Sequence, residues 1–367
     1  MVHGAADTRH DGVADYVEHL LDALPSVGVD AVGVRLDSLA TTRDEIVLLA
    51  PDLVHVQFAP SAYRFSSMPL RLPGALLSTA PLLTTVHEYG WWSWPRWVPD
   101  PLWRLVERTG WWDRETGRLL PASAEVAVTN PGHASVVRAR LRKPVEVIPL
   151  APNVPGRVVR PDGDERNAHA PTLAFFGYVH PVKGVRYLID ALAALLDRYP
   201  ELRLLVVGGF TSQALPADEA ESFRQELIAH ARRRRVADRV EFTGYLSEDE
   251  VSARLAEADI GVLPFTEGVS TKSGALLTML AHGLPTVITE PDEPDPLLRD
   301  GREVRAVRAR RDSTALASAI DDLLARTELR HLLRTEGLRL ASDRNWSRVA
   351  EDHRAWYDRV CAGAAGA

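Results

Sequence analysis

The sequence is poor in cysteine, in long apolar runs and in excess positive charge. Cys361 is the single cysteine in 367 residues, which excludes an internal disulfide and a metal site built from several thiolates. No apolar run reaches the about 20 residues of a membrane-spanning helix, and no secretory signal is visible, so a cytoplasmic location is expected. A net charge of −7 argues against nucleic acid as the main partner.

The composition is that of an ordinary folded protein, with 46% hydrophobic and 25% charged residues, and the length suffices for two domains. Short apolar runs alternate with helical patterns, which predicts α/β domains with parallel sheets and a cleft between them. The expected boundaries are a first Rossmann-like domain at 1–150, a linker at 151–170, a second Rossmann-like domain at 171–343 and a C-terminal helix at 344–367. The expected strands are 32–36, 53–58, 81–86, 124–129 and 145–148, then 172–176, 202–207, 240–242, 260–263, 286–289 and 303–307. Among the expected helices are 42–49 and 131–141, with Pro131 in the first turn of the latter.

The beginning of the chain departs from this pattern. Only Met1 to Gly4 precede a polar stretch and a helical pattern at 13–24, whereas the first strand of a doubly wound domain is normally central. Either this strand is a short stub or the start codon lies upstream of Met1. We favour the upstream start.

The second domain is organised around residues 261–285, GVLPFTEGVSTKSGALLTMLAHGLP. A buried strand leads into a polar loop centred on Glu267, and a short helix then begins at Gly274. Ligands bind at this edge of an open α/β sheet, and the start of the helix, with Lys272 and Ser273 beside it, suits a phosphate. Glu267 can accept hydrogen bonds from sugar hydroxyls. The alternative is an ordinary connecting loop with a solvated glutamate.

Three loops at the carboxyl ends of strands are expected on one rim of this domain. They are Gly177 to Gly184, the pair Gly208 and Gly209, and Thr266 to Gly274. Glycine lets the backbone approach a ligand closely, and Lys183 adds a charge that suits a diphosphate. Glycine after a strand is common, so the succession of the three loops carries the prediction.

These residues resemble glycosyltransferases of family 4, which are retaining, nucleotide-sugar-dependent enzymes with the GT-B fold. The resemblance implies two Rossmann-like domains facing each other across a cleft, with the C-terminal helix crossing back to the first. Its strongest segments are FFGYVHPVKGVRYLIDAL at 175–192, LLVVGG at 204–209, VEFTGYLSEDEV at 240–251, AEADIGVLPFTEGVS at 256–270 and LAHGLPTVIT at 280–289. The first domain resembles the family more loosely, in the segments GVADYVEHLL, LVHVQF and TTVHEYGWW.

The resemblance implies a role for individual residues. Lys183 binds the diphosphate, Glu267 and Gly268 to Ser270 (with Val269 between) hold the sugar hydroxyls, and His87 lies near the transferred sugar. The catalytic candidates are His87, Lys183 and Glu267. The donor-binding set is Gly12, Gly177, Lys183, Gly208, Gly209, Tyr245, Leu246, Glu267, Gly268, Val269, Ser270, Lys272 and Thr278.

Two positions depart from the family pattern. The family usually has arginine after the glycine of the first loop of its second domain, where this chain has Tyr178. It also usually has a second glutamate on the helix after the first one, where it binds the ribose. Alignment on His282 to Pro285 places Thr278 there, while counting from Glu267 alone places Ala275. We expect the Thr278 hydroxyl to bind the ribose more weakly than a carboxylate, and Lys272 to supply the missing cation.

The acceptor side is expected in the first domain, with Glu88, Trp91 and Trp92 beside His87. Seven of the nine tryptophans fall between 91 and 112, and aromatic faces stack on sugars or lie at membrane interfaces. Packing of these rings onto their own domain is the alternative, as is a structural role for His87. The arginines at 232–235 decorate a solvated helix end or face anionic lipid, so a peripheral membrane contact stays open.

The sequence therefore predicts a retaining glycosyltransferase that moves a sugar from a nucleoside diphosphate to a hydroxyl acceptor, a glycan, glycolipid or small metabolite, for carbohydrate biosynthesis. The resemblance implies no metal and no cofactor beyond the donor. Two other enzymes of this fold stay open, a phosphorylase and a pseudo-glycosidic coupling enzyme. A non-catalytic sugar-binding module is the alternative from another class, because of Tyr178, Thr278 and the missing first strand.

Overall fold

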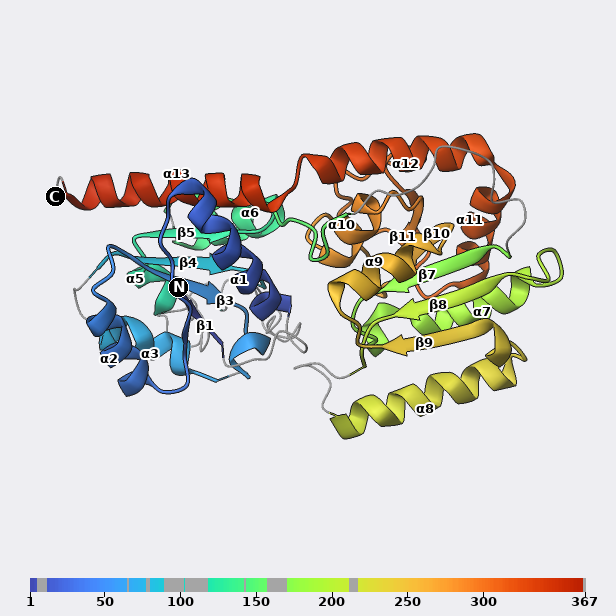
Figure 1. Cartoon of the computed structure of the whole chain (residues 1–367), viewed down its shortest axis with the longest axis horizontal. Coiled ribbons are helices and arrows are strands. Elements are labelled where there is room, and N and C mark those ends of the chain that lie inside the picture. The colour runs from blue at the N-terminus through green and yellow to red at the C-terminus, as the bar shows by residue number, and fades with distance from the viewer. Residues whose placement is uncertain are drawn as a thin grey trace. The chain divides into compact units, whose positions relative to one another are not determined.

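The computed structural model describes residues 1–4, 12–64, 66–76, 80–88, 102, 118–141, 143–156, 170–210 and 217–365. The chain divides into two compact units (Figure 1). Unit 1 is Met1–Pro149 with Trp346–Ala367, and unit 2 is Leu150–Asn345. Most of the predicted linker, residues 157–169, lies outside the described residues.

Unit 1 contains a parallel sheet of six strands in the order β2-β1-β3-β4-β5-β6. The strands are β1 (Val2–His3), β2 (Val34–Arg35), β3 (Val54–Phe58), β4 (Leu82–Val86), β5 (Glu125–Val128) and β6 (Val145–Val147). The helices are α1 (Gly12–Ala23), α2 (Leu39–Leu49), α3 (Met68–Ala75), α5 (Leu119–Ala122), α6 (Pro131–Leu141) and α13 (Trp346–Ala365). Every residue of β3 and β4 is buried, as in a sheet covered on both faces.

The first strand is a stub of two residues in a central place. Val2 of β1 is 1% exposed and pairs with Val34 of β2 and Val56 of β3. β1 thus occupies the position that a doubly wound sheet assigns to its first strand. The start upstream of Met1 stays a prediction.

Unit 2 contains a second parallel sheet of six strands, in the order β12-β11-β10-β7-β8-β9. They are β7 (Thr172–Phe176), β8 (Arg203–Val207), β9 (Val240–Gly244), β10 (Ile260–Leu263), β11 (Thr286–Thr289) and β12 (Arg305–Val307). The helices are α7 (Val185–Leu195), α8 (Ala217–Arg233), α9 (Glu248–Ala256), α10 (Gly274–Ala281), α11 (Ser313–Ala325) and α12 (Thr327–Ser342). Together the two sheets confirm the predicted α/β class.

The C-terminal helix α13 packs on unit 1, as the resemblance implies (Figure 1). The Trp356 ring is fully buried, and its Nε1 donates to Glu125 Oε2 of β5 at 2.7 Å. The Tyr357 hydroxyl lies 2.7 Å from His55 Nδ1 of β3. Among the described residues, none of the helices combines the length and apolarity that crossing a membrane requires.

Element ends differ from the prediction where a cap or a turn decides them. The strand expected at 32–36 shortens to Val34–Arg35. The helix expected from Thr42 begins earlier, at Leu39, because the Ser38 side chain accepts a hydrogen bond from Thr41 N. The 3₁₀ turn Pro181–Lys183 interrupts the predicted loop 177–184 and brings Lys183 to the start of α7.

Candidate functional site

Two glycine turns pack against each other at the carboxyl ends of β7 and β8. Gly177 has φ +124° and Gly208 has φ +140°, a backbone region that other residues rarely adopt. A Cβ on Gly208 would lie 2.2 Å from the carbonyl oxygen of Gly177. Val179 N donates to Gly209 O at 2.9 Å, so the two loops form one surface. Glycine is therefore required here by close backbone packing within the unit.

Lys183 lies at the junction of the β7 and β10 loops. Its Nζ is 3.8 Å from the centroid of the Phe265 ring. A Cβ on the next residue, Gly184, would lie 2.0 Å from Pro264 O, and Thr266 N donates to Val182 O at 2.8 Å. Lys183 is half-buried in this junction, and its ammonium group lies over an aromatic face.

The loop after β10 is held by its backbone and exposes its carboxylate. Gly268 has φ +84°, and a Cβ there would lie 2.3 Å from the Pro291 backbone. Val269 is 1% exposed, and its N–H donates to Thr289 O at 2.8 Å. The Glu267 side chain is 75% exposed, and Arg311 Nη2 lies 3.4 Å from its Oε1. Glu267 is thus presented to solvent by a fixed backbone.

The first turn of α10 is a candidate anion site. Ser273 is the N-cap, and its Oγ accepts a hydrogen bond from Leu276 N at 3.3 Å. Lys272, directly before it, is exposed. A Cβ on Gly274 would lie 1.7 Å from Asn153 Oδ1, so another residue there would require the Asn153 side chain to move. Backbone N–H groups and the helix dipole favour negative charge at such a helix start.

Thr278, the residue expected to bind the ribose, is buried inside unit 2. Its side chain is fully buried, and its Oγ1 accepts a hydrogen bond from Val154 N at 3.2 Å. His282 Nδ1 lies 2.8 Å from the Thr278 carbonyl at the end of the same helix, and the bond to Val154 ties this helix to the segment after β6. The hydroxyl therefore serves the packing of unit 2 in this structure, and we give it no place in the proposed site.

The candidates that would border a base lie at the end of β9. Tyr245 is 54% exposed, and a Cβ on Gly209 would lie 3.6 Å from its Cβ. Leu246 is half-buried, as are Tyr178 in the β7 loop and Ser270 in the β10 loop. These residues belong to the same carboxyl edge of the sheet as Lys183.

His87 lies in unit 1, at the end of β4. Its ring is half-buried, and its Nε2 is 2.8 Å from Gln57 Oε1. Tyr16 contacts the ring edge-on, with centroids 4.7 Å apart. Burial, and then the nearby imidazoles of His353 and His133, lower the pKa of His87 to about 3. His87 is therefore neutral at neutral pH.

The remaining candidates expected in unit 1 are Gly12, Glu88, Trp91 and Trp92. Gly12 is the exposed first residue of α1, with open space where a Cβ would be. Glu88 is exposed. Trp91 and Trp92, like the other five tryptophans between 91 and 112, lie outside the described residues.

The sequence analysis missed two residues that the structure ties to candidates. Gln57 is a fully buried amide in β3 that contacts His87, and Asp295 accepts hydrogen bonds from Thr271 in the β10 loop. For Gln57 a signal was present, since a polar residue stands inside the apolar run LVHVQF. A buried polar group needs a partner, and its partner is a candidate for function.

Residues 170–326 match the family model described as "Glycosyl transferases group 1". A phosphatidyl-myo-inositol mannosyltransferase of Mycobacterium leprae is 30% identical over 190 residues, which is 52% of this chain and 46% of that protein. The chain thus spans about half the length of the first curated relatives it matches. The family-model match at 170–326 includes the loops of unit 2 described above.

Solved structures extend the similarity over both units. A sucrose-phosphate synthase from Thermosynechococcus elongatus has a TM-score of 0.73 at 20% identity, covering 98% of this chain and 96% of that one. Anabaena HepE, solved in complex with UDP and glucose, has a TM-score of 0.70 at 15% identity, covering 98% and 99%. The GT-B fold is confirmed, and so is the resemblance to GT-B glycosyltransferases. Assignment to family 4 stays a prediction.

Proposed function

We propose, from a GT-B fold whose second unit matches the group 1 glycosyltransferases, that this protein transfers a sugar from a nucleoside diphosphate to a hydroxyl acceptor with retention of configuration. One observation carries the proposal. The glycine turns after β7 and β8, Lys183 over Phe265 and the start of α10 form one joined edge of unit 2. That edge combines backbone donors with fixed positive charge, which a diphosphate requires.

In the proposed donor site Lys183 and the N-terminus of α10 hold the diphosphate. Lys272 adds a second cation, and Glu267, with the backbone of Gly268 to Ser270, accepts hydrogen bonds from the sugar. Gly209, Tyr245 and Leu246 border the base. One structural neighbour supports the nucleotide, since HepE was solved with UDP and glucose. The mycobacterial sequence relative is named a mannosyltransferase, which supports the transfer of a sugar.

The chemistry we propose is front-face transfer. The bond between the anomeric carbon and the diphosphate oxygen breaks, and the acceptor hydroxyl attacks from the same face and passes its proton to the leaving diphosphate. Lys183, Lys272 and the α10 N-terminus stabilise the charge that develops on that leaving group. No protein carboxylate acts as nucleophile, and the chain's share is positioning and charge stabilisation.

His87 is proposed to contact the transferred sugar as a neutral hydrogen-bonding ring. The acceptor side is assigned to unit 1, with Glu88, Trp91 and Trp92. Gly12 at the start of α1 would face the donor phosphates or the acceptor. The absence of a metal requirement and the cytoplasmic location stay predictions.

Calorimetric titration of the full chain with UDP, GDP, ADP and dTDP tests the donor site. We expect one nucleotide to bind, and Lys183→Met to weaken its binding about tenfold or more, because methionine keeps a contact with the Phe265 ring but not the charge. Arg239→Met is the matched control. Arg239 precedes β9, at the amino end of the sheet, where it pairs with Glu201.

Activity assays, run beside the calorimetry, give a different result for each alternative function. A phosphorylase would form sugar phosphate from a glycan and inorganic phosphate without any nucleotide. A sugar-binding module would bind a nucleotide sugar and release no nucleoside diphosphate. A folded chain that binds none of the nucleotides would contradict the proposal.

A further inference from the structure

Thr271 is buried in the middle of the loop that carries Glu267 and Lys272. The loop between β10 and α10 runs from Pro264 to Ser273, ten residues, whereas connections between a strand and a helix usually take about 2–6 residues. A longer loop loses more conformational entropy when it is ordered. Thr271 is nevertheless only 4% exposed. Something outside the loop therefore holds it.

Asp295, which lies outside the loop, holds Thr271 through hydrogen bonds. Its Oδ2 accepts two hydrogen bonds from Thr271, from the backbone N–H at 2.8 Å and from Oγ1 at 2.7 Å. Its Oδ1 accepts from Leu297 N at 3.0 Å, and Leu298 N donates to Asp295 O at 3.0 Å, which closes a turn. Both carboxylate oxygens are thus engaged, one by the loop and one by the segment between β11 and β12.

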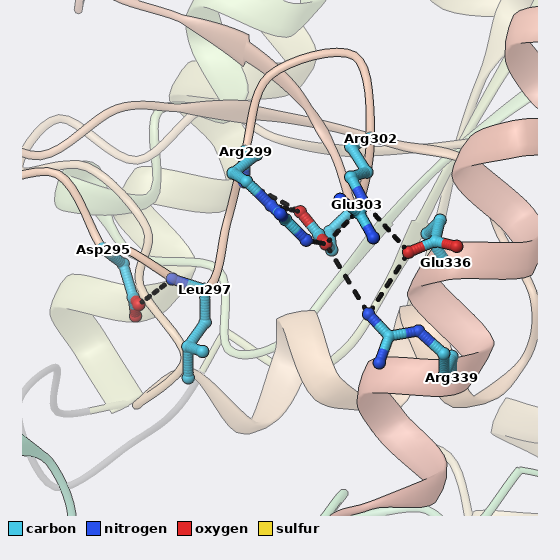
Figure 2. Close-up of polar contacts among 7 residues, drawn as sticks. All are labelled: Asp295, Leu297, Arg299, Arg302, Glu303, Glu336 and Arg339. Atoms are coloured by element: carbon cyan, nitrogen blue, oxygen red, sulfur yellow. Dashed lines mark hydrogen bonds and ion pairs between the residues drawn. The ribbon is translucent and has the colours of Figure 1, made fainter.

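The segment that carries Asp295 is itself anchored (Figure 2). Glu303, 2% exposed, pairs with Arg299, whose backbone N–H donates to Glu303 Oε2 at 3.0 Å. Arg302 Nε, from the neighbouring residue in the chain, lies 3.5 Å from Glu303 Oε1, and Nη2 of Arg339 in α12 lies 4.0 Å from the same oxygen. Both arginines also donate to Glu336 Oε2 of α12. The contacts of Asp295 therefore connect the loop to a segment fixed on a helix.

We infer that Asp295 is a positioning residue for nucleotide-sugar binding: through Thr271 it fixes the loop so that Lys272 and the start of α10 meet the diphosphate. The inference rests on the proposed function. Thr271 directly precedes Lys272, and Ser273 N donates to Ser270 O at 3.0 Å, so Thr271 and Lys272 are the two inner residues of one closed turn. A charged acceptor makes such hydrogen bonds stronger than a neutral one does.

Asp295→Ala and Asp295→Asn test this role, with Asp292→Asn as the control. Asp292 lies on the same segment and pairs with Arg310, with an 83% exposed side chain. The first measurement is hydrogen–deuterium exchange without ligand, resolved over residues 266–274. We expect the Thr271 amide to exchange about tenfold faster or more in Asp295→Ala, since its acceptor is gone. Asp292→Asn should leave this exchange unchanged.

The second measurement is the calorimetric Kd for the nucleotide that the unaltered chain binds. We expect Asp295→Ala to raise Kd about tenfold and Asp295→Asn to raise it less, since asparagine keeps one acceptor oxygen. Asp295→Asn also serves if the alanine variant does not fold. Unchanged exchange in Asp295→Ala would show that no clamp exists. Faster exchange with an unchanged Kd would show that the clamp does not serve binding, and either result overturns the inference.

Failure of the proposed function would give a different result from failure of the inference about Asp295. If the unaltered chain binds none of the nucleotides, the donor site itself is refuted and the role of Asp295 in binding falls with it. The exchange measurement, made without ligand, still reports whether Asp295 holds Thr271. The two failures are therefore distinguishable.

Discussion

Gln57 Oε1 lies 2.8 Å from His87 Nε2, and this contact fixes which nitrogen of the imidazole carries its proton. An amide oxygen can only accept, so Nε2 donates. The pKa of His87 is lowered to about 3, chiefly by burial, so the ring holds a single proton at neutral pH. Nδ1 is consequently an acceptor, and His87 can accept a hydrogen bond from a sugar hydroxyl.

His87 should stay neutral down to about pH 4. We expect the NMR signals of its ring, in protein labelled at histidine, to show the Nε2–H tautomer and no titration between pH 8 and pH 5. Gln57→Leu removes the acceptor and should give a mixture of tautomers. His87→Gln identifies the signals. Titration of His87 near pH 6.5 would contradict the assigned environment.

Glu267 should matter for transfer and not for stability. Because its side chain is 75% exposed, Glu267→Gln should change the free energy of unfolding by less than about 0.5 kcal/mol. If Glu267 holds the sugar in the transition state, kcat/KM for the donor should fall about a hundredfold. Arg311→Gln, which alters the residue 3.4 Å away, is the control and should change kcat/KM little. A Glu267→Gln enzyme with unaltered kcat/KM would remove this residue from the site.

The sheet positions were the most predictable part of the chain. Strands at 172–176, 260–263 and 286–289 and the helix at 131–141 lie where the apolar runs placed them. These segments are buried in parallel sheets or begin at a proline suited to the first turn of a helix, so local pattern and tertiary packing agree. The ends shifted where single hydrogen bonds decide, as at Ser38 before α2.

The glycine loops and Lys183 were predictable as neighbours at the carboxyl edge of the second sheet, but the contacts that support them were not. A positive φ at Gly177, Gly208 and Gly268 follows from turns that a strand-loop pattern suggests. The Asp295–Thr271 contact joins residues 24 apart in sequence, and nothing local marks it. The ribose role expected of Thr278 stays a prediction. Its Oγ1 accepts a hydrogen bond from Val154 N, 124 residues away in sequence, and no local pattern marks that contact.

Glu303 should make unit 2 sensitive to acid. Burial alone would raise the pKa of this carboxyl, but hydrogen bonds from the Arg299 side chain and backbone lower it below its ordinary value. A lowered pKa stabilises the fold above the unfolded value, about 4.3, and this contribution is lost as the pH falls through the folded value. Glu303→Gln should reduce the free energy of unfolding at pH 7 by about 1–3 kcal/mol.

Urea unfolding between pH 7 and pH 3 measures this effect. Part of the wild-type loss of stability below about pH 4.5 should be missing in Glu303→Gln. Glu351→Gln is the control, because Glu351 is 57% exposed and pairs only with Arg348 among the described residues. Equal stability of Glu303→Gln and the unaltered chain at pH 7 would show that the arginines around Glu303 are satisfied by solvent instead.

His353 should destabilise unit 1 at mildly acidic pH. The residue lies in α13, is fully buried, and has Nδ1 2.7 Å from Val349 O. Its Nε2 has no hydrogen-bond partner among the described residues. Burial lowers its pKa to about 4, although the Val349 hydrogen bond acts in the other direction. The neutral ring therefore belongs to the folded state, and protonation favours unfolding.

The direction of this pH dependence follows from the pKa of His353 in the unfolded chain and in the folded protein. Between the unfolded pKa, about 6.5, and the folded pKa, about 4, the unfolded chain binds more protons, so stability falls as the pH falls, by about 3 kcal/mol over this window. His353→Leu should lose about 1 kcal/mol at pH 8, for the missing hydrogen bond, and show a flatter dependence between pH 6.5 and pH 4. His331→Leu, at an exposed histidine of α12, should keep the wild-type slope. A slope that His353→Leu leaves unchanged would mean that the other buried imidazoles, His55 foremost, account for the acid sensitivity, because the pKa of His55 is also lowered by burial.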